Sequence, residues 1–337
     1  MMTSRERIRT IIAGQPADRC GFWLGCPHGE TWAIYHAYFG TKSDEELRQK
    51  LGDDFRWICP QWMPGAYRSP NGRGIFDTGT AGYHAAAGPL AECETVAELD
   101  RYPWPKAENM DFAPALAALD AAGDVYRASG LWTCYYHNLM DLIGIEEYFM
   151  KMHTHPEVVA AATDRVCQFY YDANERFFRE AGDRADAFFF GNDFGTQRDS
   201  MCSPAHFEQF VLPWARKFTA QAPRHGRQVI LHSCGSIWRV IDQLIDAGVQ
   251  CLHQLQALAT GMDAGSLAAR HKGRIAFLGG IDTQDLLVNG NPCASARRSP
   301  SRQGPARAVR HHQPKPRGPV AQHPTPERRR DGRGSLR

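Results

Sequence analysis

Short apolar runs alternate with amphipathic stretches along most of the chain. After an amphipathic helical opening at residues 3–12, residues 19–25 and 54–60 have the pattern of strands, the second by alternation of polar and apolar positions. Apolar runs of about five to seven residues follow at positions 130–136, 187–193, 229–234, 250–256 and 275–281. Stretches with helical periodicity separate the later runs, as at residues 207–221 and 238–247. The pattern therefore predicts strands that alternate with helices.

Strands that alternate with helices form a parallel sheet, because each helix returns the chain to the same end of the sheet. Four or more such units in a chain of 337 residues favour an α/β fold of the (β/α)8 TIM barrel type. A doubly wound open sheet is the alternative. No Gly-x-Gly-x-x-Gly pattern follows the first predicted strand, which argues against a dinucleotide-binding version of that sheet.

Polar residues follow four of the predicted strands, at the end of a barrel where catalytic groups gather. From their residue types we predict catalytic roles for Asp193, Gln197, His232 and Asp282. Substrate-binding roles are predicted for Asn192, His253, Gln256 and Gly280. Each prediction has a structural alternative. Asp282 is equally well explained as a helix N-cap, and the pattern slightly favours a hydrogen-bonded core histidine for His253.

His232 and Cys234 form the most distinctive pair in the sequence. Side chains two residues apart in a strand point to the same side, so both can reach one metal ion or one reacting group. A catalytic zinc usually has three protein ligands, and the sequence identifies no third one. Cys202, Cys251 and Cys293 are candidates only if the fold brings one of them close. The alternative for Cys234 is a small buried apolar residue.

Composition limits the classes of function. No run approaches the 18 or so apolar residues that a membrane span needs, and the first ten residues do not resemble a signal peptide, so we expect a cytoplasmic protein without membrane contact. The ten cysteines show no repeating framework, which favours reduced thiols over disulfides. Residues 1–290 carry 27 basic and 35 acidic groups, so this part offers no basic surface for nucleic acid. A small-molecule substrate is the expected partner.

Residues 4–290 resemble the uroporphyrinogen decarboxylase superfamily. The resemblance rests on Asp-Phe-Gly-Thr-Gln at 193–197, His-Ser-Cys-Gly at 232–235, Gly-Gly-Ile-Asp at 279–282 and Tyr-Pro-Trp-Pro at 102–105. It implies a barrel domain over residues 1–290, with an active-site cleft at the carboxyl ends of the strands. It also implies one of two activities.

The first implied activity is uroporphyrinogen III decarboxylation, a lyase reaction of porphyrin and haem biosynthesis that needs no cofactor. Such decarboxylases bind the substrate carboxylates with arginines on an N-terminal loop, because guanidinium groups pair with carboxylates in a bidentate way. The corresponding residues 23–30 contain no arginine. We therefore expect this activity less than the second one.

The second implied activity is that of corrinoid-dependent methyltransferases, which bind zinc through a His-x-Cys pair and a later cysteine. His232 and Cys234 match the pair, and no residue matches the later cysteine. In this branch zinc activates a thiol, and a partner protein carries the corrinoid. A non-catalytic barrel that binds a small ligand is the alternative from another class.

Residues 291–337 differ in composition from the rest of the chain. They contain eleven arginines and eight prolines, a composition typical of a basic disordered tail. Back-translation of residues 311–324 with a one-base shift permits Ile-Ile-Ser-Pro-Ser-His-Glu, which resembles the end of superfamily members. We hypothesise a frameshift near residues 289–293. The last barrel strand and its helix would then be missing, enzymatic activity would be lost with them, and the exposed strand edges would favour aggregation.

Overall fold

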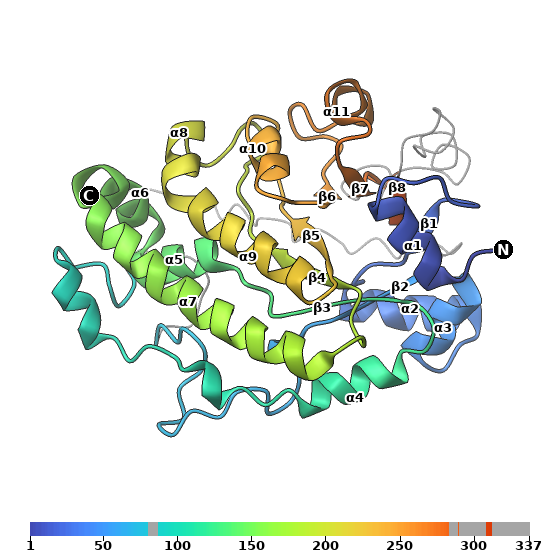
Figure 1. The fold of residues 1–337 in the computed structure, drawn as a ribbon, viewed down its shortest axis with the longest axis horizontal. Helices are drawn as coiled ribbons and strands as arrows, with labels where there is room; N and C mark the ends of the chain where they lie inside the picture. Colours follow the sequence, from blue (N-terminus) through green and yellow to red (C-terminus); the bar gives the residue numbers. More distant parts are fainter. Residues whose placement is uncertain (80–86, 283–288, 290–307, 312–337) are drawn as a thin grey trace, which may run out of the picture.

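The computed structural model describes residues 1–79, 87–282, 289 and 308–311. Its strands form one parallel sheet in the order β1-β8-β7-β6-β5-β4-β3-β2, which is the strand order of a (β/α)8 barrel (Figure 1). The predicted TIM-barrel fold class is therefore confirmed. The strands are β1 (Gly21–Trp23), β2 (Phe55–Ile58), β3 (Tyr126–Ser129), β4 (Ala187–Gly191), β5 (Gln228–His232), β6 (Cys251–Leu255), β7 (Ala276–Gly279) and β8 (Ala308–His311).

Helices surround this sheet, and α7 and α9 run along its outer side beside β4 and β5 (Figure 1). The α-helices are α1 (Ser4–Ile12), α2 (Gly29–Phe39), α3 (Asp44–Leu51), α4 (Ala113–Ala121), α5 (Tyr135–Ile143), α6 (Ile145–Thr154), α7 (Pro156–Ala181), α8 (Pro204–His206), α9 (Leu212–Arg224), α10 (Ile241–Asp246) and α11 (Ala264–His271). Short helical turns are η1 (Pro60–Trp62), η2 (Val96–Arg101), η3 (Ala107–Asn109) and η4 (Phe207–Val211).

Strand β4 is an unbroken apolar run because both of its faces are buried. Successive side chains of a strand point to opposite faces of the sheet. Ala187 and Phe189 pack in the barrel interior, whereas Phe188 and Phe190 belong to the core shared with the outer helices. A strand covered on both faces has no position for a polar residue until it ends, so the polar groups are confined to the strand ends.

Helix α1 covers the barrel at the amino ends of the strands. Its residues Ile8, Ile11 and Ile12 pack with the side chains of the barrel interior. On its polar side, Arg5 and Arg9 bind the buried carboxylate of Asp186, which directly precedes β4. The carboxyl ends of the strands, where barrel enzymes have their catalytic residues, lie at the opposite end.

A buried aspartate, Asp54, joins β1 and β2, the two terminal strands in the order of the sheet. Asp54 accepts hydrogen bonds from the backbone N–H of Phe22 in β1 and from the side chains of Ser4, Arg7 and Arg19. Its own backbone N–H donates to the carbonyl of Phe22 over 2.8 Å. Because β1 and β2 are the terminal strands of the sheet, these bonds close the barrel.

The structure corrects the predicted strand at residues 130–136. The third strand is β3, which ends at Ser129, and α5 begins at Tyr135 within the predicted range. The run at 130–136 is apolar because Leu131, Tyr135 and Tyr136 are buried beneath helices. A buried helix start and a buried strand have the same apolar character over so few residues.

The structure also corrects the expectation that the last strand is missing. β8, from within the segment expected to lie outside the barrel, pairs with β7 and with β1. Strand pairing uses backbone N–H and C=O groups, so a segment of unusual composition can still take that place. The other residues of 291–337, including Cys293 and any closing helix, lie outside the described residues. Within the part of the chain that the structure describes, no helix has the length and apolar character to cross a bilayer.

Loss of the Asp54 charge is expected to destabilise the whole barrel. In Asp54→Asn, Arg7, whose side chain is 4% exposed, loses one of its two carboxylate partners. Breaking a buried ion pair costs about 3–5 kcal/mol of unfolding free energy. Urea denaturation followed by circular dichroism measures this loss.

Asp120→Asn is the matched control, because its ion pair with Arg184 is largely exposed. Exposed pairs contribute about 1 kcal/mol or less. Equal denaturation midpoints for the two variants would contradict a closing role for Asp54.

Candidate functional site

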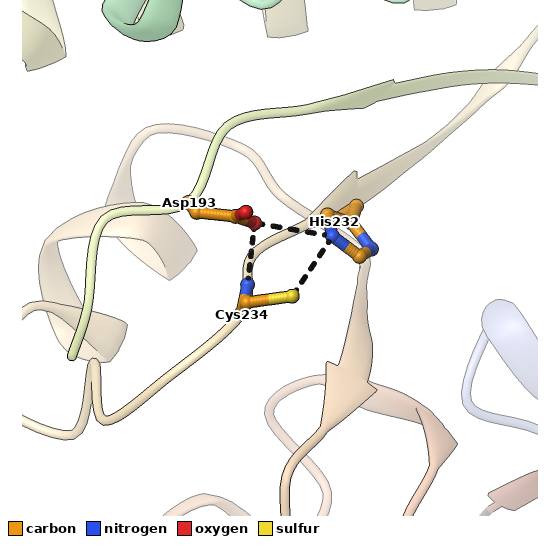
Figure 2. Close-up of side chains that lie close together, drawn as sticks. All are labelled: Asp193, His232 and Cys234. Atoms are coloured by element: carbon orange, nitrogen blue, oxygen red, sulfur yellow. Dashed lines mark hydrogen bonds and ion pairs between the residues drawn. The ribbon is translucent and has the colours of Figure 1, made fainter. Parts of the chain in front are cut away.

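Three ligand-type side chains meet where β4 and β5 end. Asp193 follows β4, His232 is the last residue of β5, and Cys234 lies two residues further along (Figure 2). His232 Nε2 lies 3.2 Å from Asp193 Oδ1 and 3.4 Å from Cys234 Sγ. One ligand atom of each side chain lies within 4.8 Å of the other two. Among the described residues, this is the one cluster of three or more metal-ligand side chains.

Two glycines allow the loops after β4 and β5 to approach so closely. Gly235 has φ +80°, and a Cβ there would collide with the backbone carbonyl of Gly195. A Cβ on Gly195 would in turn collide with the backbone of Ser236. With the loops in contact, the backbone N–H of Cys234 donates to Asp193 Oδ1 over 2.9 Å. The glycines therefore fix the position of both the carboxylate and the thiol.

Burial raises the pKa of both acidic groups of the cluster, whereas the neighbouring charge lowers the pKa of one and raises that of the other. Burial raises the pKa of Asp193, but the hydrogen bond and positive charge of His232, together with the N–H of Cys234, outweigh it and hold the pKa well below its ordinary value. Burial, followed by the negative charge of Asp193, raises the pKa of the Cys234 thiol to about 12. Without a cation beside it, Cys234 is therefore a protonated thiol at neutral pH.

His253 lies behind His232 and orients its ring. The two Nδ1 atoms are 2.8 Å apart, which leaves Nε2 of His232 facing Asp193 and Cys234. His253 is 6% exposed. The ring of Trp132 packs on another side of His232, with ring centroids 5.2 Å apart. His253 thus contacts the cluster through His232, and its predicted contact with substrate stays a prediction.

Two predicted glutamines bind each other and support the same loops. Gln197 Nε2 donates to Gln256 Oε1 over 3.0 Å, and the backbone N–H of Gly235 donates to the same oxygen over 2.9 Å. Asn192 lies deeper, 1% exposed, where its amide accepts from the N–H of Tyr136 and donates to the carbonyl of Thr133. Their predicted roles in catalysis and substrate binding stay predictions.

Gly280 and Asp282 follow β7 at the same end of the barrel, and both are partly exposed. Their predicted roles are not tested by the geometry. Two of the cysteines considered as a third ligand lie elsewhere. Cys251 is buried at the start of β6 in the barrel interior, and Cys202 lies outside the cluster, packed against the core of the outer helices.

A cavity of about 600 Å³ adjoins the cluster at Asp193. Its lining includes Trp62, Trp132, His137 and Asp141, none of which the sequence singled out. His137 Nε2 lies 3.7 Å from Asp193 Oδ2. His137 and Asp141 belong to α5, which follows β3 and borders the cavity.

Comparison with known proteins shows the family of the chain and a likeness in fold. The family model described as uroporphyrinogen decarboxylase (URO-D) matches residues 93–299, which is more than half of the chain. A solved structure described as a methyltransferase from Methanosarcina mazei is similar in fold, with a TM-score of 0.61 and 16% sequence identity over 95% of each chain. No curated protein matches the sequence. The chain belongs to the uroporphyrinogen decarboxylase family.

Proposed function

We propose that this chain is a methyltransferase-like enzyme of the family, in which Asp193, His232 and Cys234 bind zinc and activate a substrate thiol. The observation that carries the proposal is the meeting of a carboxylate, an imidazole and a thiol within 4.8 Å. The fold likeness to a methyltransferase supports the same branch. As the resemblance implies, the methyl group would be carried by a corrinoid on a partner protein.

The three side chains fit zinc in their chemistry, and two of the distances between them fit its coordination geometry. Zinc binds cysteine sulfur, histidine nitrogen and carboxylate oxygen at about 2.0–2.3 Å, so ligand atoms around a tetrahedral ion lie about 3.3–3.8 Å apart. The His232 to Asp193 and His232 to Cys234 distances are 3.2 and 3.4 Å. Three protein ligands leave a fourth position for a substrate atom. Bound there, zinc would lower the pKa of a substrate thiol and hold it as the thiolate.

The other residues of the site orient these ligands. His232 would bind through Nε2 and donate its Nδ1–H to His253, the arrangement that fixes the tautomer of a metal-binding histidine. The backbone N–H of Cys234 holds Asp193 in place. Trp132 covers the ring of His232 and limits access of water on that side.

The cavity supports the methyltransferase-like activity over porphyrinogen decarboxylation. A porphyrinogen with several carboxylates needs guanidinium groups to bind them. No arginine or lysine is among the described residues that line the cavity. Its volume of about 600 Å³ suits a smaller substrate.

Zinc analysis tests the metal ligands. The full chain, dialysed after exposure to zinc, is expected to retain about one equivalent, and Cys234→Ala is expected to lose most of it. Cys202→Ala is the matched control, since Cys202 lies outside the cluster. Equal zinc content in all three proteins, measured by mass spectrometry, would refute a site at Cys234.

Substitution of His253 tests its positioning role. In His253→Phe the ligands are unchanged but His232 loses its Nδ1 partner, so zinc affinity should fall about 10–100-fold. Competition with a chromophoric chelator measures the affinity. The exposed His153, changed to Phe, serves as the control. An unchanged affinity in His253→Phe would mean that this histidine only fills the core.

A direct assay separates the two activities of the family. Incubation of the chain with excess uroporphyrinogen III is expected to release no carboxylate, because the cavity lining lacks guanidinium groups. Chromatography of the oxidised porphyrins measures the number of carboxylates, with an authentic decarboxylase as the positive control. Conversion by this chain at a comparable rate would establish the decarboxylase activity instead.

A further inference from the structure

Strand β6 contacts both residues of the His-x-Cys pair at the end of β5. His253 of β6 pairs with His232 in the sheet, and the Nδ1 atoms of the two rings are 2.8 Å apart. The next residue of β6 is Gln254, whose side-chain Nε2 donates to Cys234 Sγ over 3.9 Å. Gln254 was not among the predicted site residues. Its contact with the thiol gives the cluster a further polar neighbour.

The amide of Gln254 turns its N–H end toward the cluster. The sulfur of Cys234 offers lone pairs, and the carboxylate of Asp193 lies beside it, bound to the backbone N–H of Cys234. Both groups accept hydrogen bonds, so they favour the N–H end of an amide over its carbonyl oxygen. Gln254 is not among the described residues that line the cavity at Asp193. It therefore reaches the sulfur without occupying that cavity.

A donor to this sulfur matters because the proposed reaction involves two sulfur atoms. The substrate thiolate has to accept the methyl group, whereas Cys234 has to remain a metal ligand. If Cys234 reacted instead, its sulfur would form the bond to the methyl carbon. The bond from that carbon to the methyl carrier would break, and its electron pair would stay with the carrier. Hydrogen bonds to a metal-bound cysteine sulfur withdraw electron density from it, which makes it a weaker nucleophile.

We propose that Gln254 is a positioning residue that directs the transferred group to the substrate sulfur and away from Cys234. Its side-chain N–H withdraws electron density from Cys234 Sγ and keeps this sulfur a ligand. The inference rests on the proposed function, because it takes Cys234 as a ligand of the metal.

Alkylation of Cys234 in the full chain, saturated with zinc, tests the inference. The sulfur displaces iodide from iodoacetamide, and mass spectrometry of the peptides gives the rate at Cys234 alone. Gln254→Met keeps the length of the side chain but removes the N–H, so the rate should rise about 3–10-fold, the equivalent of one lost hydrogen bond. Gln254→Lys supplies a charged donor in place of the amide and should lower the rate.

Two controls separate loss of the donor from a general loosening of the site. Gln243→Met removes an amide from α10 that donates to Pro204 and Glu208, and it should leave the rate at Cys234 unchanged. The exposed thiol of Cys26 is the internal standard and should react equally in every protein.

A spectroscopic measurement follows the sulfur directly. With cobalt in place of zinc, the sulfur-to-metal charge-transfer band should move to longer wavelength in Gln254→Met, because a more electron-rich sulfur gives up an electron more easily. Gln243→Met should leave the band in place. A band that is unchanged in Gln254→Met would show that the amide does not act on the sulfur.

The outcomes separate this inference from the proposed function. A chain that retains no zinc would refute the proposed function, and the inference with it. Equal alkylation rates in the wild-type chain and Gln254→Met, with one equivalent of zinc in each, would overturn the inference alone. Faster alkylation in Gln254→Lys would overturn it too, because loosening of the site would then explain the effect. If Gln254→Met does not fold, the comparison of Gln254→Lys with the wild-type chain decides, and a rate that is not lowered counts against the inference.

Discussion

The close contact between the loops that follow β4 and β5 determines the whole candidate site. Parallel pairing places Gly191 opposite His232, and the glycines at 195 and 235 let the two loops touch through their backbones. Asp193 is thereby brought to His232 and Cys234. The carboxylate comes from one strand and the other two groups from the next. The cluster therefore depends on a tertiary contact and not on any one segment of sequence.

The sequence predicted the barrel well where strands are buried on both faces. Residues 187–191 and 229–231 are apolar throughout, and the strands found there, β4 and β5, agree closely with the prediction. The prediction failed at residues 130–136, because the buried start of α5 is equally apolar. It also failed at β8, whose place in the sheet is set by backbone pairing with β7 and β1.

The candidate site was predictable only in part from the sequence. His232 and Cys234 were recognisable together because their spacing is local and strand geometry is regular. Asp193 was predicted as a catalytic residue but not as the third ligand of this pair, because only the contact between the loops after neighbouring strands brings it to them. A rule that compares the ends of adjacent parallel strands would have found it. His137 and Asp141 could not be found, because their place beside Asp193 depends on how α5 packs and not on a pattern in the sequence.

The barrel closure at Asp54 has a consequence for the order of events during synthesis. Its partners Ser4, Arg7, Arg19 and Phe22 all lie within the first part of the chain. Synthesis proceeds from the amino terminus, so this junction can form while β4 and β5 are still untranslated. β1 and β2 are thus joined first, and the later strands must add to the sheet from this pair. A purification tag placed before Ser4 preserves this junction, whereas trimming into α1 removes its first contacts.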